Sequence, residues 1–424
     1  MKKIFLFSFI FFIYYPLIAN AKNKETYEYL DLFGKVFDRV KAEYVEEVTD
    51  EELIEKAIDG MLTGLDPHSG YMNEQVWEDM QRDTQGKFGG LGIEITMEEG
   101  FVKVIAPIED TPAFEAGILA GDYVIQIDET AVFGLTLNEA VELMRGKKGS
   151  PIKITISREG TEPFEVSIIR DYIKIQSVKH KVYKDIGYLR ITSFTEQTES
   201  GLHKSILEIQ NDLDNKVRGY ILDLRSNPGG LLNQAVKVAD IFLSKGEIVS
   251  TRGRKKSDIK RYKARVKDKL KGKPLVVLID GGSASASEIV AGALQDHRRA
   301  LIIGTQSFGK GSVQTIIPFS KSNSESISGI RLTTARYYTP SGSSIQGKGI
   351  TPDIIVEQGT FESYNFKTYS ESDLKDSLEQ SNQDDDFQNE NDEGKNNKLN
   401  KDYQLKRALD LIKAISLSQE FIRD

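Results

Sequence analysis

The sequence predicts an α/β protein whose core is a largely parallel sheet. Apolar runs at 219–224, 275–279 and 300–303 each end in a loop rich in Gly, Ser or Asn, and helical patterns follow the first two. Strands that are apolar on both faces and alternate with helices are typical of a parallel sheet covered on both sides. Residues 86–171 instead show short alternating runs around two small helices, which predicts a separate, mostly-β module.

The elements before the module are predicted to be helical. Apolar residues recur at helical spacing over 26–62, in two helices, with Asp50 as the cap of the second. The loop 65–72 follows, because Pro67 disfavours helix at Asp66. His68 in this loop is expected to pack rather than bind a metal, since no second ligand is near it in the sequence.

Composition excludes several kinds of chemistry. The 424 residues include no cysteine and four histidines, without an H-E-x-x-H pattern. Disulfide scaffolds, thiol nucleophiles, Cys-ligated metal sites and zincins are therefore excluded. Catalysis would have to use hydroxyls, amines or carboxylates, and the length suffices for about three domains.

The first 21 residues have the pattern of a secretory signal peptide. Lys2 and Lys3 precede an apolar run over 4–18, and the triplet 19–21 reads Ala-Asn-Ala, which predicts cleavage after Ala21. An uncleaved anchor is the alternative, because the apolar run is long for a signal. Either way, we expect the protein to work outside the cytoplasmic membrane.

Charge is concentrated in two segments. Residues 362–393 contain eleven acids and two lysines, a charge of −9, so the rest of the chain carries +1 of the total of −8 and is nearly neutral. It has few core-forming residues and is predicted to be disordered, whereas 401–417 regain helical spacing and predict a docking helix. The twelve Lys and Arg of 252–273 are expected to form a solvated hairpin or helix, which is favoured over a nucleic-acid patch because the chain is expected to be exported.

Three loops are expected to meet at one edge of the sheet. They span 225–230, 281–287 and 304–312, and each follows a predicted parallel strand. Strands joined by such crossovers run in the same direction, so their carboxyl ends lie at one edge, where sites form in open α/β sheets.

Ser285 is the candidate nucleophile in these loops. Small residues flank it and a helix follows it, so the helix N-terminus would favour negative charge developing nearby. A capping box with Glu288 is the structural alternative. His297 is a poor base because it lies about 17 Å along that helix, at 1.5 Å per residue. Lys310 on the neighbouring loop can act as base if burial lowers the amine pKa, and Gln314 could hold the neutral amine.

Backbone amides are expected to bind the oxyanion. Gly229 or Gly230 would supply one donor and Ala286 the second, although a tight turn alone would also explain the two glycines. A phosphate-binding G-x-x-x-x-G-K at 304–310 is disfavoured, because Gly311 replaces the Ser or Thr that holds Mg²⁺ and a strand, not a helix, follows.

Four motifs together resemble those of the C-terminal processing peptidases, also called tail-specific proteases. They read LDPHSGYM at 65–72, LDLRSNPGG at 222–230, SASASEI at 283–289 and FGKGSVQ at 308–314. The resemblance covers 30–357 and extends to the helix at 403–417. It implies a Ser–Lys endopeptidase with a ClpP/crotonase-like core and an inserted PDZ domain. Ser285 would be the nucleophile, Lys310 the base and Gln314 its orienting residue, with Asp296 at a solvated helix end and Ser283 and Ser287 at the helix start.

The mostly-β module resembles the PDZ part of this family. Its segment GGLGI at 89–93 is similar to the loop that binds a C-terminal carboxylate through successive amides. The expected contacts of a bound tail are Gly90, Leu91, Gly92, Ile93 and Leu143. Arg145 either couples tail binding to catalysis or is a solvated charge, and the second interpretation is preferred.

The resemblance and the patterns together predict an exported serine endopeptidase that recognises protein C-termini. A catalytically inert PDZ adaptor is the alternative. No cofactor or nucleic acid is implied. The expected partners are proteins with apolar or unstructured C-termini, an adaptor protein among them, and the expected location is the periplasm or the outer face of the inner membrane. The expected division is signal peptide 1–21, helical region 22–84, PDZ domain 85–171, peptidase core 172–357, acidic linker 358–400 and C-terminal helix 401–424.

Overall fold

The computed structural model of the protein describes residues 17–108, 110–174, 176–265, 267–320, 327–359 and 402–423. Most of the predicted signal peptide and almost all of the predicted acidic linker lie outside these residues. The chain divides into two compact units. The first contains the described residues up to Glu74 with Gln314–Thr333, and the second contains Gln75–Val313 with the described residues from Thr334 onward.

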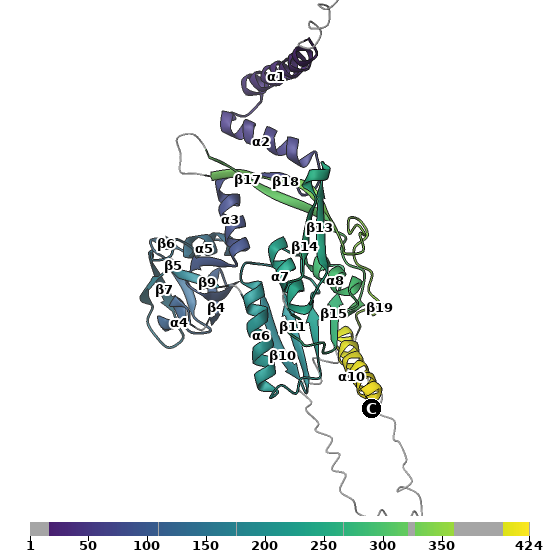
Figure 1. The fold of residues 1–424 in the computed structure, drawn as a ribbon. Coiled ribbons are helices and arrows are strands. Elements are labelled where there is room, and N and C mark those ends of the chain that lie inside the picture. Colours follow the sequence, from purple (N-terminus) through teal and green to yellow (C-terminus); the bar gives the residue numbers. More distant parts are fainter. Residues whose placement is uncertain are drawn as a thin grey trace, which may run out of the picture. The chain divides into compact units, whose positions relative to one another are not determined.

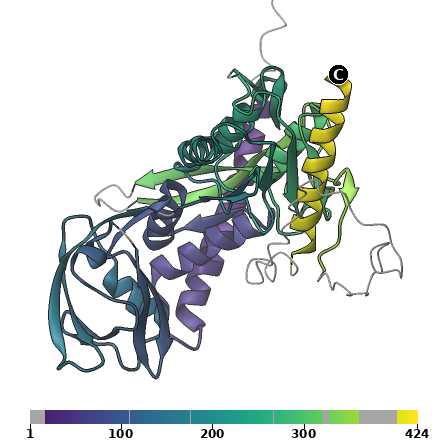
Figure 2. The same ribbon diagram turned by 90° about the horizontal axis from the view of Figure 1, so that it is seen from below.

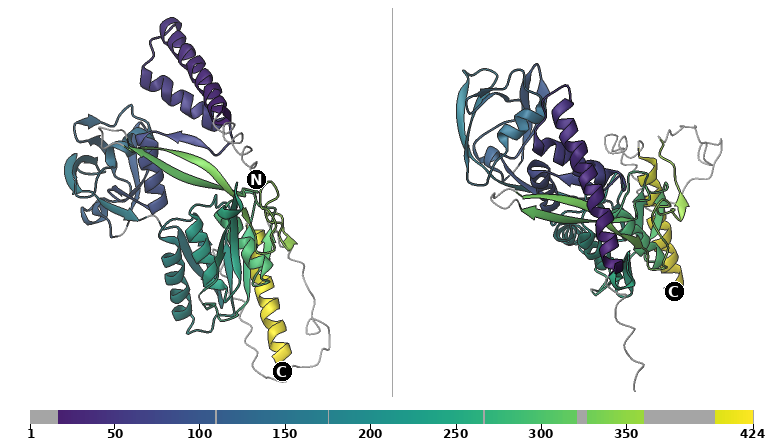
Figure 3. Two further views of the ribbon diagram at one scale, coloured as in Figure 1. Left: turned by 45° about the horizontal axis from the view of Figure 1, so that its top comes forward. Right: turned by 90° about the horizontal axis from the view of Figure 1, so that it is seen from above.

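The first unit combines two helices with a small antiparallel sheet. Helices α1 (Leu17–Glu43) and α2 (Asp50–Thr63) are drawn in purple in Figure 3. Strand β1 (Gly70–Met72) pairs antiparallel with β18 (Ile327–Tyr338), which also pairs with β17 (Ser312–Ser320). The prediction that Asp50 caps α2 is wrong. The N-cap is Thr49, whose extended backbone lets its hydroxyl accept from the Glu52 amide, while Asp50 is already helical.

The mostly-β module has its own sheet and core. Five strands lie in the order β3-β4-β5-β7-β8, with the short β6 beside β5. The first and last strands of the module, β2 and β9, form a separate antiparallel pair. Its elements are α3 (Glu74–Gln85), β2 (Lys87–Gly90), β3 (Ile93–Glu98), β4 (Phe101–Pro107), α4 (Pro112–Glu115), β5 (Tyr123–Ile127), β6 (Thr130–Ala131), α5 (Leu137–Met144), β7 (Pro151–Ser157), β8 (Phe164–Ile169) and β9 (Asp171–Lys174). Alternating side chains of the strands form one apolar cluster, as the period-2 pattern predicts.

The core of the second unit is a six-stranded sheet in the order β10-β11-β12-β15-β16-β19. All neighbours are parallel except β10 and β11, which confirms the predicted, largely parallel sheet. Figure 1 shows the labelled ribbon of the chain. The strands of this sheet and the helices that cover it are β10 (Val178–Tyr183), β11 (Ile186–Ile191), α6 (Thr198–Asp212), β12 (Gly219–Asp223), α7 (Leu232–Phe242), β15 (Leu275–Ile279), α8 (Ala286–Asp296), β16 (Leu301–Gly304), β19 (Ile354–Ile355) and α10 (Tyr403–Arg423).

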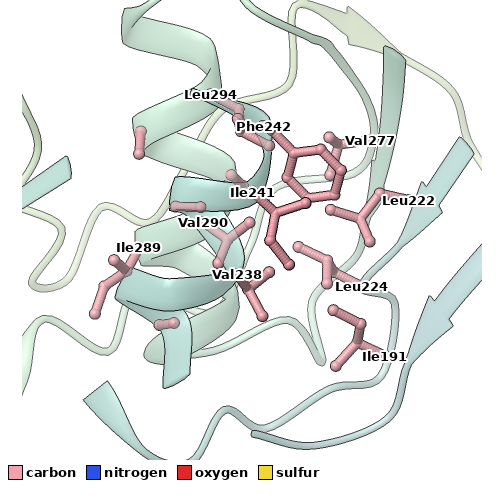
Figure 4. Packing of buried hydrophobic residues seen from close by; sticks show 14 of the residues in the cluster. Ile191, Leu222, Leu224, Val238, Ile241, Phe242, Val277, Ile289, Val290 and Leu294 are labelled. Atoms are coloured by element: carbon pink, nitrogen blue, oxygen red, sulfur yellow. The ribbon is translucent and has the colours of Figure 1, made fainter. Parts of the chain in front are cut away.

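The two faces of this sheet are buried against different helices. Leu222 of β12, Leu224 directly after it and Val277 of β15 pack against α6, α7 and α8, as the close-up in Figure 4 shows for α7 and α8. The intervening Ile221 and Val276 point to the other face, where they join a cluster with α10, the yellow helix of Figure 2. Burial on both faces explains why these strands are apolar throughout.

Two further strands form the Lys- and Arg-rich hairpin. Strand β13 (Glu247–Gly253) pairs antiparallel with β14 (Lys260–Lys263), and a short 3₁₀ turn, η1 (Lys256–Asp258), lies between them. The side chains at 254–261 are exposed, which confirms the predicted solvated hairpin. Strand β13 also pairs with the end of β18, from Ser250 opposite Tyr338 to Gly253 opposite Ala335.

Within the described residues, no helix combines the length and the apolar character needed to cross a membrane.

Candidate active site

The three predicted loops contact one another at the carboxyl edge of the parallel sheet. The Ala284 amide donates to the Asn227 carbonyl at 3.0 Å, which joins the first loop to the second. The Phe308 amide donates to the Ser283 carbonyl at 3.0 Å, which joins the second to the third. The convergence that the topology predicts is therefore confirmed.

Ser285 lies at the junction between the loop after β15 and the start of α8. Its φ of 53° and ψ of −107° are unusual for a residue with a side chain. Such a conformation costs about 1–3 kcal/mol and persists only where the surrounding structure enforces it. A serine held on a sharp strand-to-helix turn is a recurrent way of presenting a nucleophilic hydroxyl.

The two neighbouring serines have structural hydrogen bonds. The buried Ser283 hydroxyl donates to the Leu224 carbonyl at 2.8 Å. The buried Ser287 hydroxyl donates to the Asn227 carbonyl at 3.0 Å, so both serines tie their loop to the 225–230 loop. Among the three serines, Ser285 alone has the strained backbone, which favours it as the nucleophile.

Glu288 connects the Ser285 turn with the loop of Lys310. Its fully buried carboxylate accepts from the Ser285 amide at 2.7 Å and from the Lys310 amide at 2.9 Å. It also accepts from the Gly309 amide at 2.7 Å and the Ser307 hydroxyl at 2.6 Å. The capping-box interpretation therefore covers only the bond to Ser285. The other three partners come from a distant loop that no local pattern points to.

Lys310 is half-buried on a loop that packs tightly against the chain. A Cβ added at Gly311 would lie 2.3 Å from the Gln346 nitrogen, so only glycine fits there. Gly311 thus lets the loop of Lys310 approach the backbone at Gln346 closely.

Tyr337 also reaches this site, and the sequence analysis did not identify it. Its amide donates to the Gly311 carbonyl at 2.7 Å, and the Ser285 side chain is near enough to its phenol to lower the pKa of that group. Burial raises the pKa of Tyr337 to about 12, against the opposing effect of Ser285. The phenol is therefore protonated at neutral pH.

The two candidate oxyanion donors of the first loop differ in the structure. The Gly229 amide donates to the Asn227 side chain at 2.9 Å, so it is already engaged. This leaves Gly230 as the stronger candidate of the pair. Its φ of 136° requires glycine, and a Cβ there would lie 2.3 Å from the Phe194 carbonyl oxygen. Ala286, the first residue of α8, has an amide without an intrahelical acceptor.

Comparison with known proteins shows the family of the chain. The model of peptidase family S41 matches residues 185–356, that of the PDZ domain matches 89–168, and that of the activating protease CtpB N-terminal domain matches 17–76. The carboxy-terminal-processing protease of Bartonella bacilliformis is 56% identical over 362 residues, which cover 84% of this chain and 82% of that protein. The chain belongs to the carboxy-terminal-processing protease family. It is a serine endopeptidase with a PDZ domain.

Further similar proteins have the same description. The carboxy-terminal processing protease CtpA of Bacillus subtilis is 36% identical over 330 residues, covering 77% of this chain and 69% of that protein. Among solved structures, the photosystem II D1 C-terminal processing protease is 30% identical with a TM-score of 0.45, covering 75% of this chain and 85% of that chain.

In the protease, the candidate PDZ contacts occupy different environments. Leu91 is buried in the core of the module, and its carbonyl accepts from the Ala113 amide at 2.8 Å. Gly92 has a φ of 83° and its carbonyl accepts from the Ile108 amide at 2.8 Å. Ile93 is half-buried and Leu143 is 37% exposed, so these two present apolar surface beside the loop that starts at Gly90.

Gln314 belongs to the first unit, near the start of β17. Its side-chain nitrogen donates to the Thr333 hydroxyl at 3.2 Å. It is the third residue of β17 and follows Lys310 by four positions in the sequence, and its orienting role stays a prediction.

Three other charged or titratable residues have structural partners. Asp296 is exposed and accepts from the Ser341 amide at 2.8 Å, in agreement with a solvated helix end. His297 at the far end of α8 is hydrogen-bonded to the Glu247 carbonyl at 2.7 Å. Arg145 is 34% exposed and pairs with the exposed Glu142 at 2.8 Å, and its guanidinium lies 5.3 Å from the Phe88 ring centroid. This surface ion pair is compatible with the preferred interpretation of a solvated charge, and the coupling role stays a prediction.

Proposed function

We propose that the protease cleaves exported proteins near their C-termini with a Ser285–Lys310 dyad. Ser285 Oγ attacks the scissile carbonyl carbon while the neutral Lys310 amine takes its proton. The tetrahedral oxyanion accepts hydrogen bonds from the amides of Gly230 and Ala286. Lys310 then gives the proton to the leaving amine, and a water molecule releases the acyl group by the same steps in reverse order.

The observation that carries this proposal is the network around Glu288. One buried carboxylate binds the amides of Ser285 and Lys310, so it holds the turn of the nucleophile and the loop of the base in a common frame. Such preorganisation is what covalent catalysis requires, because the reacting groups need no rearrangement during the reaction. The environment of Ser283 and Ser287 supports the same assignment, since their hydroxyls are engaged elsewhere.

The PDZ domain would supply substrate recognition. We assign Gly90, Leu91, Gly92 and Ile93 to the binding of the substrate carboxylate and last residues, with Leu143 against the terminal side chain. An extended tail would add as a strand, and main-chain bonds would give affinity while the apolar contact gives selectivity. The substrates would be proteins with apolar or unstructured tails, brought directly or by an adaptor protein.

Export through the signal at 1–21 would place the reaction in the cell envelope. The basic start, the apolar run and the Ala-Asn-Ala exit support this location, in the periplasm or on the outer face of the inner membrane. The anchor alternative would leave the enzyme on that face of the membrane. Mass determination of the N-terminus of the protein isolated from cells distinguishes the two.

The test of the dyad compares wild type, Ser285→Ala and Lys310→Ala on a loosely folded protein with an apolar C-terminus, without ATP. Cleavage products are identified by mass spectrometry. We expect wild type to cleave and both variants to be at least 1,000-fold slower. Ser200→Ala and Lys245→Ala, at exposed positions, are matched controls that should cleave like wild type. Binding of the tail without cleavage in every protein would instead establish the inert PDZ adaptor.

A further inference from the structure

Asn227 is a polar residue of the 225–230 loop to which the proposed function gives no role. It is fully buried, and both ends of its side-chain carboxamide are hydrogen-bonded. The nitrogen donates to the Ile191 carbonyl at 2.8 Å, and the oxygen accepts from the Gly229 amide at 2.9 Å. One side chain therefore joins the glycines of this loop to the end of β11, and all three residues belong to the second unit.

The chemistry of the two partners fixes how the carboxamide of Asn227 is oriented. A backbone carbonyl only accepts and a backbone amide only donates, so the nitrogen faces Ile191 and the oxygen faces Gly229. The second bond closes a turn in which the side chain binds the amide two residues further on, which Asn and Asp favour. Pro228 has no N–H group, so the amide of Gly229 is the first donor after Asn227 in the chain.

The main-chain carbonyl of Asn227 joins the same loop to the turn of the nucleophile. It accepts from the Ala284 amide at 3.0 Å and from the Ser287 hydroxyl at 3.0 Å. These two partners lie on either side of Ser285 in the sequence. Asn227 therefore holds the glycine loop with its side chain and the Ser285 turn with its main chain.

The peptide between Gly229 and Gly230 has a fixed direction. The Gly229 carbonyl accepts from the Phe194 amide at 2.8 Å. In a trans peptide the C=O and N–H groups point in opposite directions, so the Gly230 N–H points away from Phe194. A Cβ added at Gly229 would lie 2.9 Å from the Ser285 Cβ and 3.0 Å from the Ala286 nitrogen. The two glycines thus lie directly beside the nucleophile turn and the second candidate donor.

We propose that Asn227 is a positioning residue of the oxyanion hole. Its side chain holds the Gly229 amide away from the substrate and leaves the Gly230 amide as the donor of this loop. The inference rests on the proposed function, in which the oxyanion binds the amides of Gly230 and Ala286. Donors that are already in place stabilise the developing charge without reorganisation. Without the bond to Asn227 the Gly229 amide is free to turn, and the loop no longer presents one donor in one direction.

The test compares Asn227→Ala and Asn227→Asp with the wild-type full-length enzyme. Alanine removes both side-chain bonds, whereas aspartate keeps an acceptor for the Gly229 amide but places a carboxylate oxygen against the Ile191 carbonyl. We expect kcat to fall about 100-fold in Asn227→Ala and less than tenfold in Asn227→Asp, with KM within twofold in both. Asn227→Asp should nevertheless have the lower melting temperature, because a buried charge then faces a carbonyl.

A structural role would make kcat follow the melting temperature. Equal losses of kcat in the two variants, or a larger loss in Asn227→Asp, therefore overturn the proposal. If Asn227→Asp does not fold, Asn227→Ser takes its place, because a serine hydroxyl can bind the amide two residues on in a similar turn. Failure of all three variants to fold would make Asn227 a structural residue and would also overturn the proposal.

A peptide aldehyde gives a second readout that concerns the oxyanion itself. Ser285 Oγ adds to the aldehyde carbon, and the former carbonyl oxygen then occupies the position of the oxyanion. The inhibition constant of the aldehyde, measured on the folded enzyme, should rise by the same factor by which kcat/KM falls in each variant. An inhibition constant that stays at the wild-type value in Asn227→Ala would contradict a role in the oxyanion hole.

The matched control is Gln234→Ala in α7. Gln234 is a second buried carboxamide that bridges backbone groups: it accepts from the Glu199 amide at 3.0 Å and donates to the Glu196 carbonyl at 3.3 Å. Its loss should lower the melting temperature and leave kcat and the inhibition constant within twofold of wild type. A fall in kcat as large as that of Asn227→Ala would show that any lost buried bond has this effect, and would overturn the proposal.

The same assay separates this inference from the proposed function. Wild-type kcat in Asn227→Ala, with Ser285→Ala and Lys310→Ala inactive, overturns the positioning role and leaves the dyad intact. Absence of cleavage by the wild type overturns the proposed function, and the inference falls with it.

Discussion

Glu288 holds four donors with one buried carboxylate, and three of them are the backbone amides of Ser285, Gly309 and Lys310. Bonds to a charged acceptor contribute about 1.5–3 kcal/mol each, more than neutral ones. The group therefore fixes the geometry of both reacting residues without contacting the substrate, and its contribution depends on its charge and on its two oxygens.

We predict that Glu288→Gln lowers kcat by about 10- to 100-fold, or roughly 1.4–2.8 kcal/mol of barrier. Glutamine keeps the size, but its nitrogen is a donor that would face N–H groups, so at least one bond becomes a repulsive contact. Initial rates on a quenched peptide check this, with thermal unfolding measured in parallel. Glu159→Gln, in an exposed turn of the PDZ domain, is the control and should match wild type. An unchanged kcat in Glu288→Gln would contradict the positioning role.

The pH dependence of the rate is set by the base. Lys310 acts only when neutral, and an unperturbed lysine has a pKa near 10.4, so kcat/KM should rise as the pH increases from 6 to 10. Tyr337 does not produce this rise, because burial raises its pKa to about 12 and it remains protonated throughout. Tyr337→Phe should therefore keep the alkaline increase. A kcat/KM that does not change with pH in the wild type would exclude Lys310 as the base. Loss of the alkaline increase in Tyr337→Phe would show that the phenol causes this increase.

Single residues differ in how far the sequence predicts them. Ser285 and Lys310 stand in short motifs whose context, strand then loop then helix, is local and readable. Three of the four partners of Glu288 are 19 to 22 positions away, and Tyr337, whose pKa Ser285 lowers, comes from the distal part of β18. Such contacts depend on tertiary packing, which the spacing of residues in the sequence does not predict. Gly229 shows the same limit, since only the structure reveals its bond to Asn227.

At the scale of elements, helix α10 is joined to the loop that carries Gly229 and Gly230. Arg225, at the start of that loop, binds Asp223 of β12 and Asp402, the residue before α10, with bonds of 2.7 and 2.8 Å to the two oxygens of Asp402. Burial opposes ionisation of Asp402, but the bonds from Arg225 outweigh it and hold the pKa of the Asp402 carboxyl below its usual value.

Asp402→Asn should therefore destabilise the protein by about 1–3 kcal/mol at pH 7. A carboxyl with a depressed pKa stabilises the fold above its unfolded pKa, near 4, and this contribution is lost as the pH falls further. The difference between wild type and Asp402→Asn should thus shrink between pH 5 and pH 3. Urea unfolding across this range measures it. Asp410→Asn on the exposed side of α10 is the control, expected within 0.5 kcal/mol of wild type. A constant difference at all pH values would exclude the ion pair as the cause.

Elements were predictable where their own pattern defines them. Alternating and continuous apolar runs predict the strands of the module and of the core, and α8 begins directly after Ser285, where the sequence predicts a helix. Helix α10 was predicted as a docking helix, but its anchor on Arg225 lies 177 positions away in the sequence. The helix start at Thr49 was misplaced by one residue, because Thr and Asp are both good caps and the backbone angles decide between them.

At the scale of the whole molecule, one chain joins a PDZ domain that would bind tails to a core that would cut them. If the PDZ domain only tethers the substrate, its binding energy is present equally in the ground state and the transition state. Such uniform binding changes KM and leaves kcat unaltered. If tail binding instead activates the core, kcat must change as well. The two arrangements therefore differ in a measurable quantity.

We predict that the PDZ domain only tethers the substrate. Amidation of the C-terminus of an apolar-tailed peptide should then raise KM at least tenfold and leave kcat within twofold of its original value. The reason is that a neutral amide cannot form the charge-assisted hydrogen bonds of a carboxylate. The Ser285→Ala enzyme should show the same tenfold loss in a direct binding measurement, since its PDZ domain is untouched. Replacement of Leu143 by Ala should weaken binding of tails ending in a large apolar residue more than of tails ending in alanine. A fall in kcat on amidation, at saturating peptide, would show that the occupied PDZ domain switches on the core.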